Sequence, residues 1–313
     1  MIVDVFFVLA GLGLLVLGGD FLVRGAVALA LRLGIAPVIV GLTVLAFGTS
    51  APELIVSVAA ALGGQPGIAL GNVVGSNIAN VLLILGATAI IAPVLSHDDE
   101  LKTGWGYAVA ASVLMIALCF AGPLVWWHGA VLLAGLALTL LLQIRRARRG
   151  RESGEELVGM DVGHAAPGRI ALWLAVGLVA LPVGAQLLVS GASDIARSFG
   201  ISEAVIGLTL VAVGTSLPEL AASVASALRG RADMALGNVI GSNLFNIGSI
   251  LGITAFFGPL HVPDQMLRVD LWVMLGCVLL LGPFLLRHIA VGRRAGAALL
   301  AVYAGYTAWL LAA

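Results

Sequence analysis

Charged residues are scarce in this sequence, and cysteine is nearly absent. Asp, Glu, Lys and Arg make up 10% of the 313 residues, hydrophobic residues make up 61%, and the mean hydropathy is +1.13. Because a soluble fold needs more polar residues to cover its surface, the composition excludes a water-soluble protein. The only cysteines, Cys119 and Cys277, fall in apolar runs, so we expect packing residues rather than a disulfide. The zero net charge argues against nucleic acid or an acidic partner.

The apolar residues gather into ten runs that are each long enough to cross a bilayer. A hydrocarbon core of about 30 Å needs roughly 20 apolar residues in a helix. The expected spans are 3–31, 36–62, 69–94, 104–121, 124–143, 169–196, 203–228, 235–259, 269–286 and 294–312. The first run lacks the basic start of a cleavable signal peptide, so we expect it to remain as a span. The sequence therefore predicts an all-α polytopic membrane protein with ten transmembrane helices.

Lys and Arg fall almost entirely on one side of this layout. Fourteen of the 16 lie in or near five alternate loops, and only Arg197 and Arg268 lie on the other side. Since cytoplasmic loops carry the excess of basic residues, both termini are expected outside the cell. The polar segment 144–168 is then a cytoplasmic linker. Its basic cluster is expected to enforce orientation, with contact to anionic lipid headgroups as the alternative.

The two halves of the chain repeat one another at an offset of 166 residues. From Gly41 to Pro93, 31 of 53 positions are identical to those from Gly207 to Pro259, without a gap. The expected organisation is a five-helix repeat over 1–143, the linker 144–168 and a second five-helix repeat over 169–313. Because five spans is an odd number, the second copy enters the membrane from the opposite side. Inverted-topology repeats of this kind are typical of transporters that expose a central site alternately to each face.

Each repeat carries one acid in an otherwise uncharged run, Glu53 in "GTSAPE" and Glu219 in "GTSLPE". A charge at the bilayer centre costs about 2.5–3.5 kcal/mol on insertion scales, and such acids usually mark ion or proton pathways. The alternative is a protonated carboxyl that is hydrogen-bonded to a neighbouring helix. Pro52 and Pro218 should bend or break each helix beside its acid, because proline lacks an N–H. Backbone carbonyls freed at membrane depth are tolerated only where they line a cavity or meet a ligand.

Residues with oxygen-bearing side chains share a helix face with each acid, at helical spacing. On the acid-bearing helices they are Thr49, Ser50 and Ser57, with Ala46 on the same face, and Thr215, Ser216 and Ser223, with Ala212 on the same face. On the next span they are Asn72, Ser76 and Asn80, matched by Asn238, Ser242 and Asn246. Calcium takes six to eight oxygen ligands, and sodium accepts similar ones. Neither motif contains His or Cys, so copper and zinc are poorly served. Two carboxylates would neutralise one Ca²⁺ or two Na⁺.

These duplicated motifs, "GTSAPE" with "GNVVGSNIAN" and "GTSLPE" with "GNVIGSNLFN", resemble the two alpha repeats of the cation/calcium exchanger superfamily, in its sodium/calcium exchanger branch. The resemblance implies that the first and sixth spans slide past the ion-binding core. Many relatives carry Asp where this chain has Asn246, which argues against potassium co-transport. The ligands that the resemblance implies are Ala46, Thr49, Ser50, Glu53, Ser76, Asn80, Ala212, Thr215, Ser216, Glu219, Ser242 and Asn246.

The expected function is secondary antiport of Na⁺ against Ca²⁺ in a bacterial or archaeal inner membrane, with no cofactor and no obligatory protein partner. A proton/calcium antiporter that uses the same glutamates remains an alternative, and so does a passive cation channel. An enzyme is disfavoured, because no nucleophile and base pair stands out. Asp20 and Arg24 are expected to form an ion pair within one helix, with a proton relay as the alternative.

Overall fold

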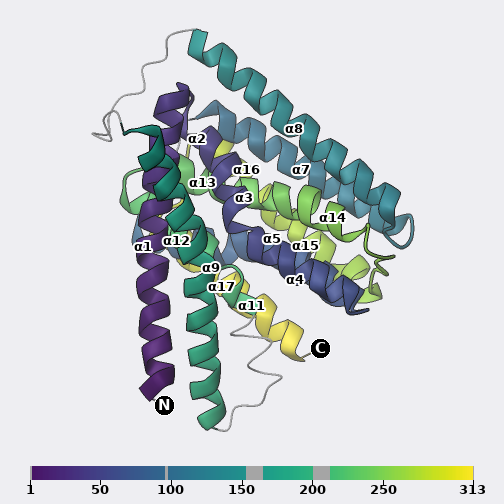
Figure 1. Ribbon diagram of the computed structural model, residues 1–313. Coiled ribbons are helices and arrows are strands. Elements are labelled where there is room, and N and C mark those ends of the chain that lie inside the picture. The colour runs from purple at the N-terminus through teal and green to yellow at the C-terminus, as the bar shows by residue number, and fades with distance from the viewer. Residues whose placement is uncertain (1, 96–97, 153–164, 200–211, 313) are drawn as a thin grey trace.

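The structure, a computed structural model, describes residues 2–95, 98–152, 165–199 and 212–312 (Figure 1). Within these ranges the chain is helical, with short π-helical segments labelled η. The first repeat contains α1 (Ile2–Leu33), α2 (Pro37–Val40), η1 (Gly41–Leu45), α3 (Ala46–Thr49), α4 (Ala51–Leu62), α5 (Pro66–Ala79), η2 (Asn80–Ile84), α6 (Leu85–Ile91), α7 (Asp99–Phe120) and α8 (Trp126–Glu152). The second contains α9 (Pro167–Ser198), α11 (Ala212–Gly214), α12 (Leu217–Leu228), α13 (Ala232–Phe245), η4 (Asn246–Leu251), α14 (Gly252–Thr254), η5 (Met266–Asp270), α15 (Leu271–Leu280), α16 (Gly282–Leu286) and α17 (Arg293–Ala312).

The predicted layout of ten spans is confirmed. Among the described residues, seven continuous helical stretches are long and apolar enough to cross a membrane, and the bent pair Pro37–Thr49 and Ala51–Leu62 makes an eighth. The two remaining predicted spans correspond to α11 with α12 and to α17. Residues 203–211 of the seventh predicted span lie outside the described residues.

The third and eighth spans form the centre of the molecule. In the most apolar stretch of Ala232–Thr254, 89% of residues are buried, and in that of Pro66–Ile91 72% are buried, against 22% for α1 and for α9. These two central spans carry the duplicated asparagine motifs. The spans with polar side chains therefore lie deepest in the protein. Lipid therefore meets the outer helices, while the polar side chains face one another.

Helices α1 and α9 run side by side at one edge of the bundle (Figure 1). Glycines recur every seven residues on both, at Gly11, Gly18 and Gly25 and, 166 residues later, at Gly177, Gly184 and Gly191. A Cβ atom added to Gly11 would lie 2.7 Å from the carbonyl oxygen of Gly184, and one added to Gly184 would lie 2.9 Å from that of Gly11. The two backbones thus approach closely because these positions have no side chain.

Two isolated antiparallel bridges join the repeats near the ends of the spans. Val94 pairs with Val291, and Leu124 pairs with Leu260. Leu260 is the counterpart of Val94 at the offset of 166 residues. Each bridge therefore links one repeat to the other, as expected for a pair of inverted copies around a pseudo-twofold axis.

Candidate ion-binding site

The second and seventh spans break at equivalent serines, three residues before the acids. Ser50 has φ −82° and ψ 6°, and Ser216 has φ −88° and ψ 4°, so neither continues the helix regularly. In the first repeat the two parts of the span differ in direction by 43°. Pro52 stands at the second position of the new helix, where its missing N–H breaks no helical hydrogen bond. The predicted bend beside Glu53 is confirmed.

Glu53 and Glu219 are each the third residue of a helix that starts at the break, α4 and α12 respectively. Their side chains are 1% and 2% exposed. The first turn of a helix carries the positive end of its dipole, which stabilises a carboxylate there. Ser50 caps no N–H of α4; instead its Oγ donates a hydrogen bond of 3.0 Å to Glu219 Oε1 of the other repeat. The two acids therefore meet at the interface between the repeats.

The third and eighth spans hold the acid-bearing helices in place through one asparagine each. Asn72 Nδ2 donates to the backbone carbonyl of Glu53 at 3.1 Å and to Ser57 Oγ at 2.9 Å. These bonds fix the backbone of Glu53 and leave its carboxylate unconstrained. The second repeat makes the same two bonds, from Asn238 Nδ2 to the carbonyl of Glu219 (3.3 Å) and to Ser223 Oγ (3.0 Å).

Four asparagines join the central spans across the pseudo-twofold axis. Asn80 Nδ2 donates to Asn243 Oδ1 at 2.9 Å, and Asn246 Nδ2 donates to Asn77 Oδ1 at 3.0 Å. The two bonds are related by the offset of 166 residues, and all four side chains are at most 1% exposed. Each bond uses the nitrogen of one predicted ligand, so the amide oxygens of Asn80 and Asn246 stay available to a cation.

Several buried oxygens of the predicted ligands have no hydrogen-bond partner in the described part of the chain. They are both carboxylate oxygens of Glu53, Oε2 of Glu219, Oγ of Ser242 and Oδ1 of Asn246. An unpaired buried polar group is destabilising, and an unpaired buried charge more so. A hard cation would neutralise the carboxylates and take these oxygens as ligands. In the described ranges no group of three or more His, Cys, Asp or Glu side chains is arranged to hold a metal ion.

The other predicted ligands surround the two breaks. Thr49 Oγ1 lies 3.4 Å from the carbonyl oxygen of Ala46 and 3.4 Å from Asn238 Oδ1. The Ala46 carbonyl also accepts the N–H of Ser50 at 3.1 Å. Ser76 is buried on α5. In the second repeat, Ala212 begins α11, and Thr215 and Ser216 occupy the break before α12.

Asn77 and Asn243 belong to the polar network but not to the predicted ligands. The helical spacing of four that selects Asn72, Ser76 and Asn80 passes over Asn77, which lies on an adjacent face. Their signal in the sequence is the duplicated tripeptide Gly-Ser-Asn, which places an asparagine at the same point of each repeat. The predicted ligands Ser76 and Asn80 lie on either side of Asn77 in the sequence, and Ser242 and Asn246 lie on either side of Asn243.

Known proteins resemble this chain over most of its length. The model of the family "Sodium/calcium exchanger protein" matches residues 3–145 and 169–312. The chain is 38% identical over 315 residues to the putative antiporter CaxA of Alkalimonas amylolytica, with 98% of each chain covered. It is 39% identical over 273 residues to the inner membrane protein YrbG of Escherichia coli (strain K12), with 85% of this chain and 84% of that one covered.

A solved structure resembles this chain over its whole length. The sodium-calcium exchanger NCX_Mj, in a crystal soaked with zero Na⁺ and Ca²⁺, superposes with a TM-score of 0.86 at 35% identity, with 99% of each chain covered. The fold is thus that of an integral membrane transporter with two inverted five-helix repeats, and the protein is not an enzyme. The chain belongs to the sodium/calcium exchanger protein family.

Proposed function

We propose that this chain is a secondary active antiporter that exchanges Na⁺ for Ca²⁺ by alternating access. The transported ions bind between a first repeat over residues 1–143 and a second over 169–313, with 144–168 as a cytoplasmic linker and both termini outside. The observation that carries the proposal is the pair of buried acids, one from each repeat, that meet without a basic side chain paired to either. None of the ion pairs among the described residues involves Glu53 or Glu219.

The proposed cage combines the two carboxylates with neutral oxygens from both repeats. Its members are Ala46, Thr49, Ser50, Glu53, Ser76 and Asn80 of the first repeat, and Ala212, Thr215, Ser216, Glu219, Ser242 and Asn246 of the second. Its charge of −2 balances one Ca²⁺ or two Na⁺. Competition between the two ions for the same oxygens is then a consequence of charge balance.

The packing of the two peripheral helices supports an outward-open state. A Cβ atom added to Gly19 of α1 would lie 2.9 Å from the carbonyl oxygen of Ala221, so α1 covers α12 on the side predicted to be cytoplasmic. The counterparts of these residues in the other repeat are Ala185 and Ile55. Ile55 is 70% exposed, so the outer half of α4 lacks the matching cover. Alternating access would exchange these two arrangements.

The charge of the cage explains why transport is an exchange. Without an ion, two carboxylates remain buried together, and their repulsion and desolvation disfavour the occluded intermediate through which both states interconvert. A bound Ca²⁺ or a set of Na⁺ removes this cost. The family members named as a sodium-calcium exchanger and as a putative antiporter support the same mode of action.

The deciding experiment is calcium uptake into proteoliposomes that contain the purified protein. We expect uptake when the vesicles are loaded with Na⁺, and none when the internal medium is choline or when only a proton gradient is imposed. Uptake that follows the proton gradient alone would establish a proton/calcium antiporter instead. Uptake without any counter-ion would overturn antiport altogether, because an antiporter needs a second ion on the opposite side of the membrane.

A further inference from the structure

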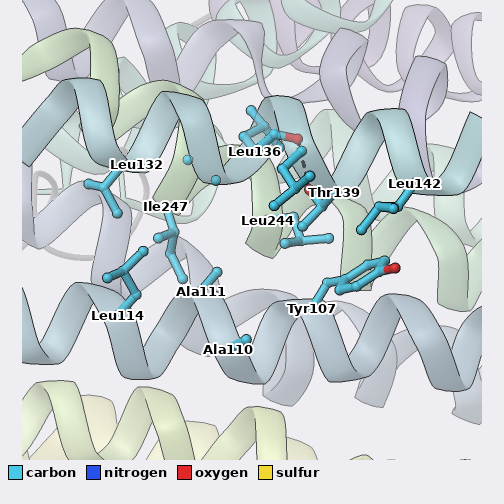
Figure 2. A pocket seen from close by; sticks show the side chains of 13 residues that line it. Tyr107, Ala110, Ala111, Leu114, Leu132, Leu136, Thr139, Leu142, Leu244 and Ile247 are labelled. Carbon is cyan, nitrogen blue, oxygen red and sulfur yellow. Dashed lines mark hydrogen bonds between the residues drawn. The ribbon is translucent and has the colours of Figure 1, made fainter.

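An apolar groove lies between α7 and α8, and neither Glu53 nor Glu219 lines it. Its volume is about 250 Å³. Figure 2 shows the two helices side by side, with Tyr107 and Leu114 from α7 and Leu132 and Leu136 from α8 at the groove. Leu244 and Ile247, at the junction of α13 and η4, complete the lining. The floor of the groove is therefore the back of the segment that carries Asn243 and Asn246.

The position and lining of the groove suit hydrocarbon rather than water. It follows α8 from Leu132 to Leu142, a length of about 15 Å at the rise of an α-helix, within the predicted span 124–143. Empty apolar cavities stay dry, because a water needs several polar partners. The groove opens toward the bilayer at Leu138, which is 57% exposed. An acyl chain is the apolar molecule that always surrounds such an opening.

One end of the groove is basic and polar. Beyond Leu142, Arg146 Nη1 donates a hydrogen bond of 2.7 Å to Thr103 Oγ1, so the guanidinium bridges α8 and α7. No ion pair among the described residues involves Arg146. Gln143 lies between Leu142 and Arg146, is 1% exposed, and finds no hydrogen-bond partner for either amide atom within the described part of the chain. Among the described residues, a cation without an acid and an amide without a partner thus lie where the predicted span reaches the cytoplasm.

We propose that this groove binds one anionic phospholipid of the cytoplasmic leaflet, with an acyl chain between α7 and α8 and the phosphate against Arg146. The unpaired cation at the end of an apolar groove suits an anionic phospholipid, which carries a phosphate and an acyl chain in one molecule, better than an apolar protein surface. A juxtamembrane Arg contributes about 1 kcal/mol to anionic lipid binding. The lipid would also support the back of η4, where Leu136 already packs against Gly248.

The test is native mass spectrometry of the full-length protein in mixed phosphatidylglycerol and phosphatidylcholine nanodiscs or micelles. We expect the wild type to retain one phosphatidylglycerol. Gly135→Phe should abolish retention, because Gly135 lines the groove and an added Cβ would have only Leu114 near it, at 4.0 Å. Ala110→Phe blocks the groove from α7 and guards against misfolding of the first variant. Gly106→Phe is the matched control on α7, at a glycine with open space around it and outside the lining.

The headgroup contact has its own variant. Arg146→Gln should lower the preference for phosphatidylglycerol over phosphatidylcholine about fivefold and leave chain binding intact. Arg32→Gln, on the same predicted side but at the end of α1, should leave the preference unchanged. Equal retention by Gly135→Phe, Ala110→Phe and Gly106→Phe, or a dimer in place of the bound lipid, would overturn the proposal. Because binding is measured without transport, the result does not depend on which ions the protein exchanges.

Discussion

Glu53 and Glu219 differ in their surroundings although they occupy equivalent positions. Glu219 accepts a hydrogen bond from Ser50, whereas neither carboxylate oxygen of Glu53 has a partner among the described residues. Removing one acid would leave an ion with half of its neutralising charge, and breaking a buried charge pair typically costs 3–5 kcal/mol. We therefore expect Glu53→Gln or Glu219→Gln to lower sodium-driven calcium uptake at least about 100-fold. Scintillation counting of proteoliposomes measures this.

The same substitutions should not destabilise the fold. Without ions, the neutral amide relieves the repulsion between two buried carboxylates, so the melting temperature of either variant should equal or exceed that of the wild type in ion-free buffer. Ser112→Ala is the control: this buried serine donates to the carbonyl of Ala108 on its own helix at 2.8 Å, and its loss should leave uptake unchanged. Wild-type uptake in Glu53→Gln would remove that acid from the cage.

Asn246 stands at the position of the proposed cage where an acid would add a third carboxylate. Its amide nitrogen donates to Asn77 Oδ1, and its oxygen has no partner among the described residues. Asn246→Asp adds a third carboxylate, so we expect tighter calcium binding and a changed dependence of uptake on sodium. Competition of Na⁺ with ⁴⁵Ca²⁺ measures both. Asn246→Ala also loses the hydrogen bond to Asn77 but gains no charge. It therefore separates the effect of the added charge from that of the lost hydrogen bond. Identical selectivity in the wild type and in Asn246→Asp would place this residue outside the cage.

The sequence locates the acids and most neighbouring oxygens because duplication marks them twice. It does not locate partners that depend on the relative placement of the two repeats. The bonds from Asn80 to Asn243 and from Asn246 to Asn77 join residues 163 and 169 positions apart, and no local periodicity predicts them. Ser50 is a further example, because a serine before a helix normally caps that helix, whereas this one bonds the acid of the other repeat.

At the scale of helices, the spans follow from hydropathy, but their internal irregularities do not. The π-helical segments η2 and η4 begin at Asn80 and Asn246, the two equivalent asparagines of the network. Single π turns within α-helices are frequent at functional sites, since the extra residue turns side chains away from the regular face. Helix α8 also continues to Glu152, well past the predicted end of its span at residue 143. Polar residues end an apolar run in the sequence, but the helix itself can continue through them.

The glycines between α1 and α9 lead to a stability prediction for this helix pair. A side chain at Gly184 must displace the backbone of α1, because its Cβ atom would lie 2.9 Å from the carbonyl oxygen of Gly11. We expect Gly184→Val to lower the free energy of unfolding by about 1–3 kcal/mol, as overpacking does. Gly13→Val is the control, since Gly13 on α1 has no atom within 4 Å of an added Cβ. Thermal unfolding in detergent should show a lower midpoint for the first variant only.

At the scale of the whole molecule, the two repeats are alike in sequence, but they differ in the contact between the peripheral helix and the acid-bearing helix. Asp20 on α1 pairs with Arg24 on the same helix at 2.9 Å, which confirms the predicted pair, and also with Arg229 at the end of α12. At the offset of 166 residues, Gln186 and Ser190 replace Asp20 and Arg24. An ion pair thus fastens the peripheral helix to the acid-bearing helix on one side of the membrane and has no charged counterpart on the other.

This asymmetry predicts that Asp20 biases the equilibrium between the two access states. A partly exposed ion pair contributes about 0.2–1 kcal/mol, so Asp20→Asn should raise the population of the inward-open state up to about fivefold. A cysteine pair at Ile55 and Ala185, the counterparts of Ala221 and Gly19, would meet only when α9 covers α4. Its oxidative cross-linking rate should therefore rise in Asp20→Asn, while Asp194→Asn, which removes an exposed ion pair within α9, should leave it unchanged. An unaltered cross-linking rate in Asp20→Asn would mean that the Asp20–Arg229 ion pair does not oppose the separation of α1 and α12. The glycine packing between the helices would then set the equilibrium between the two access states.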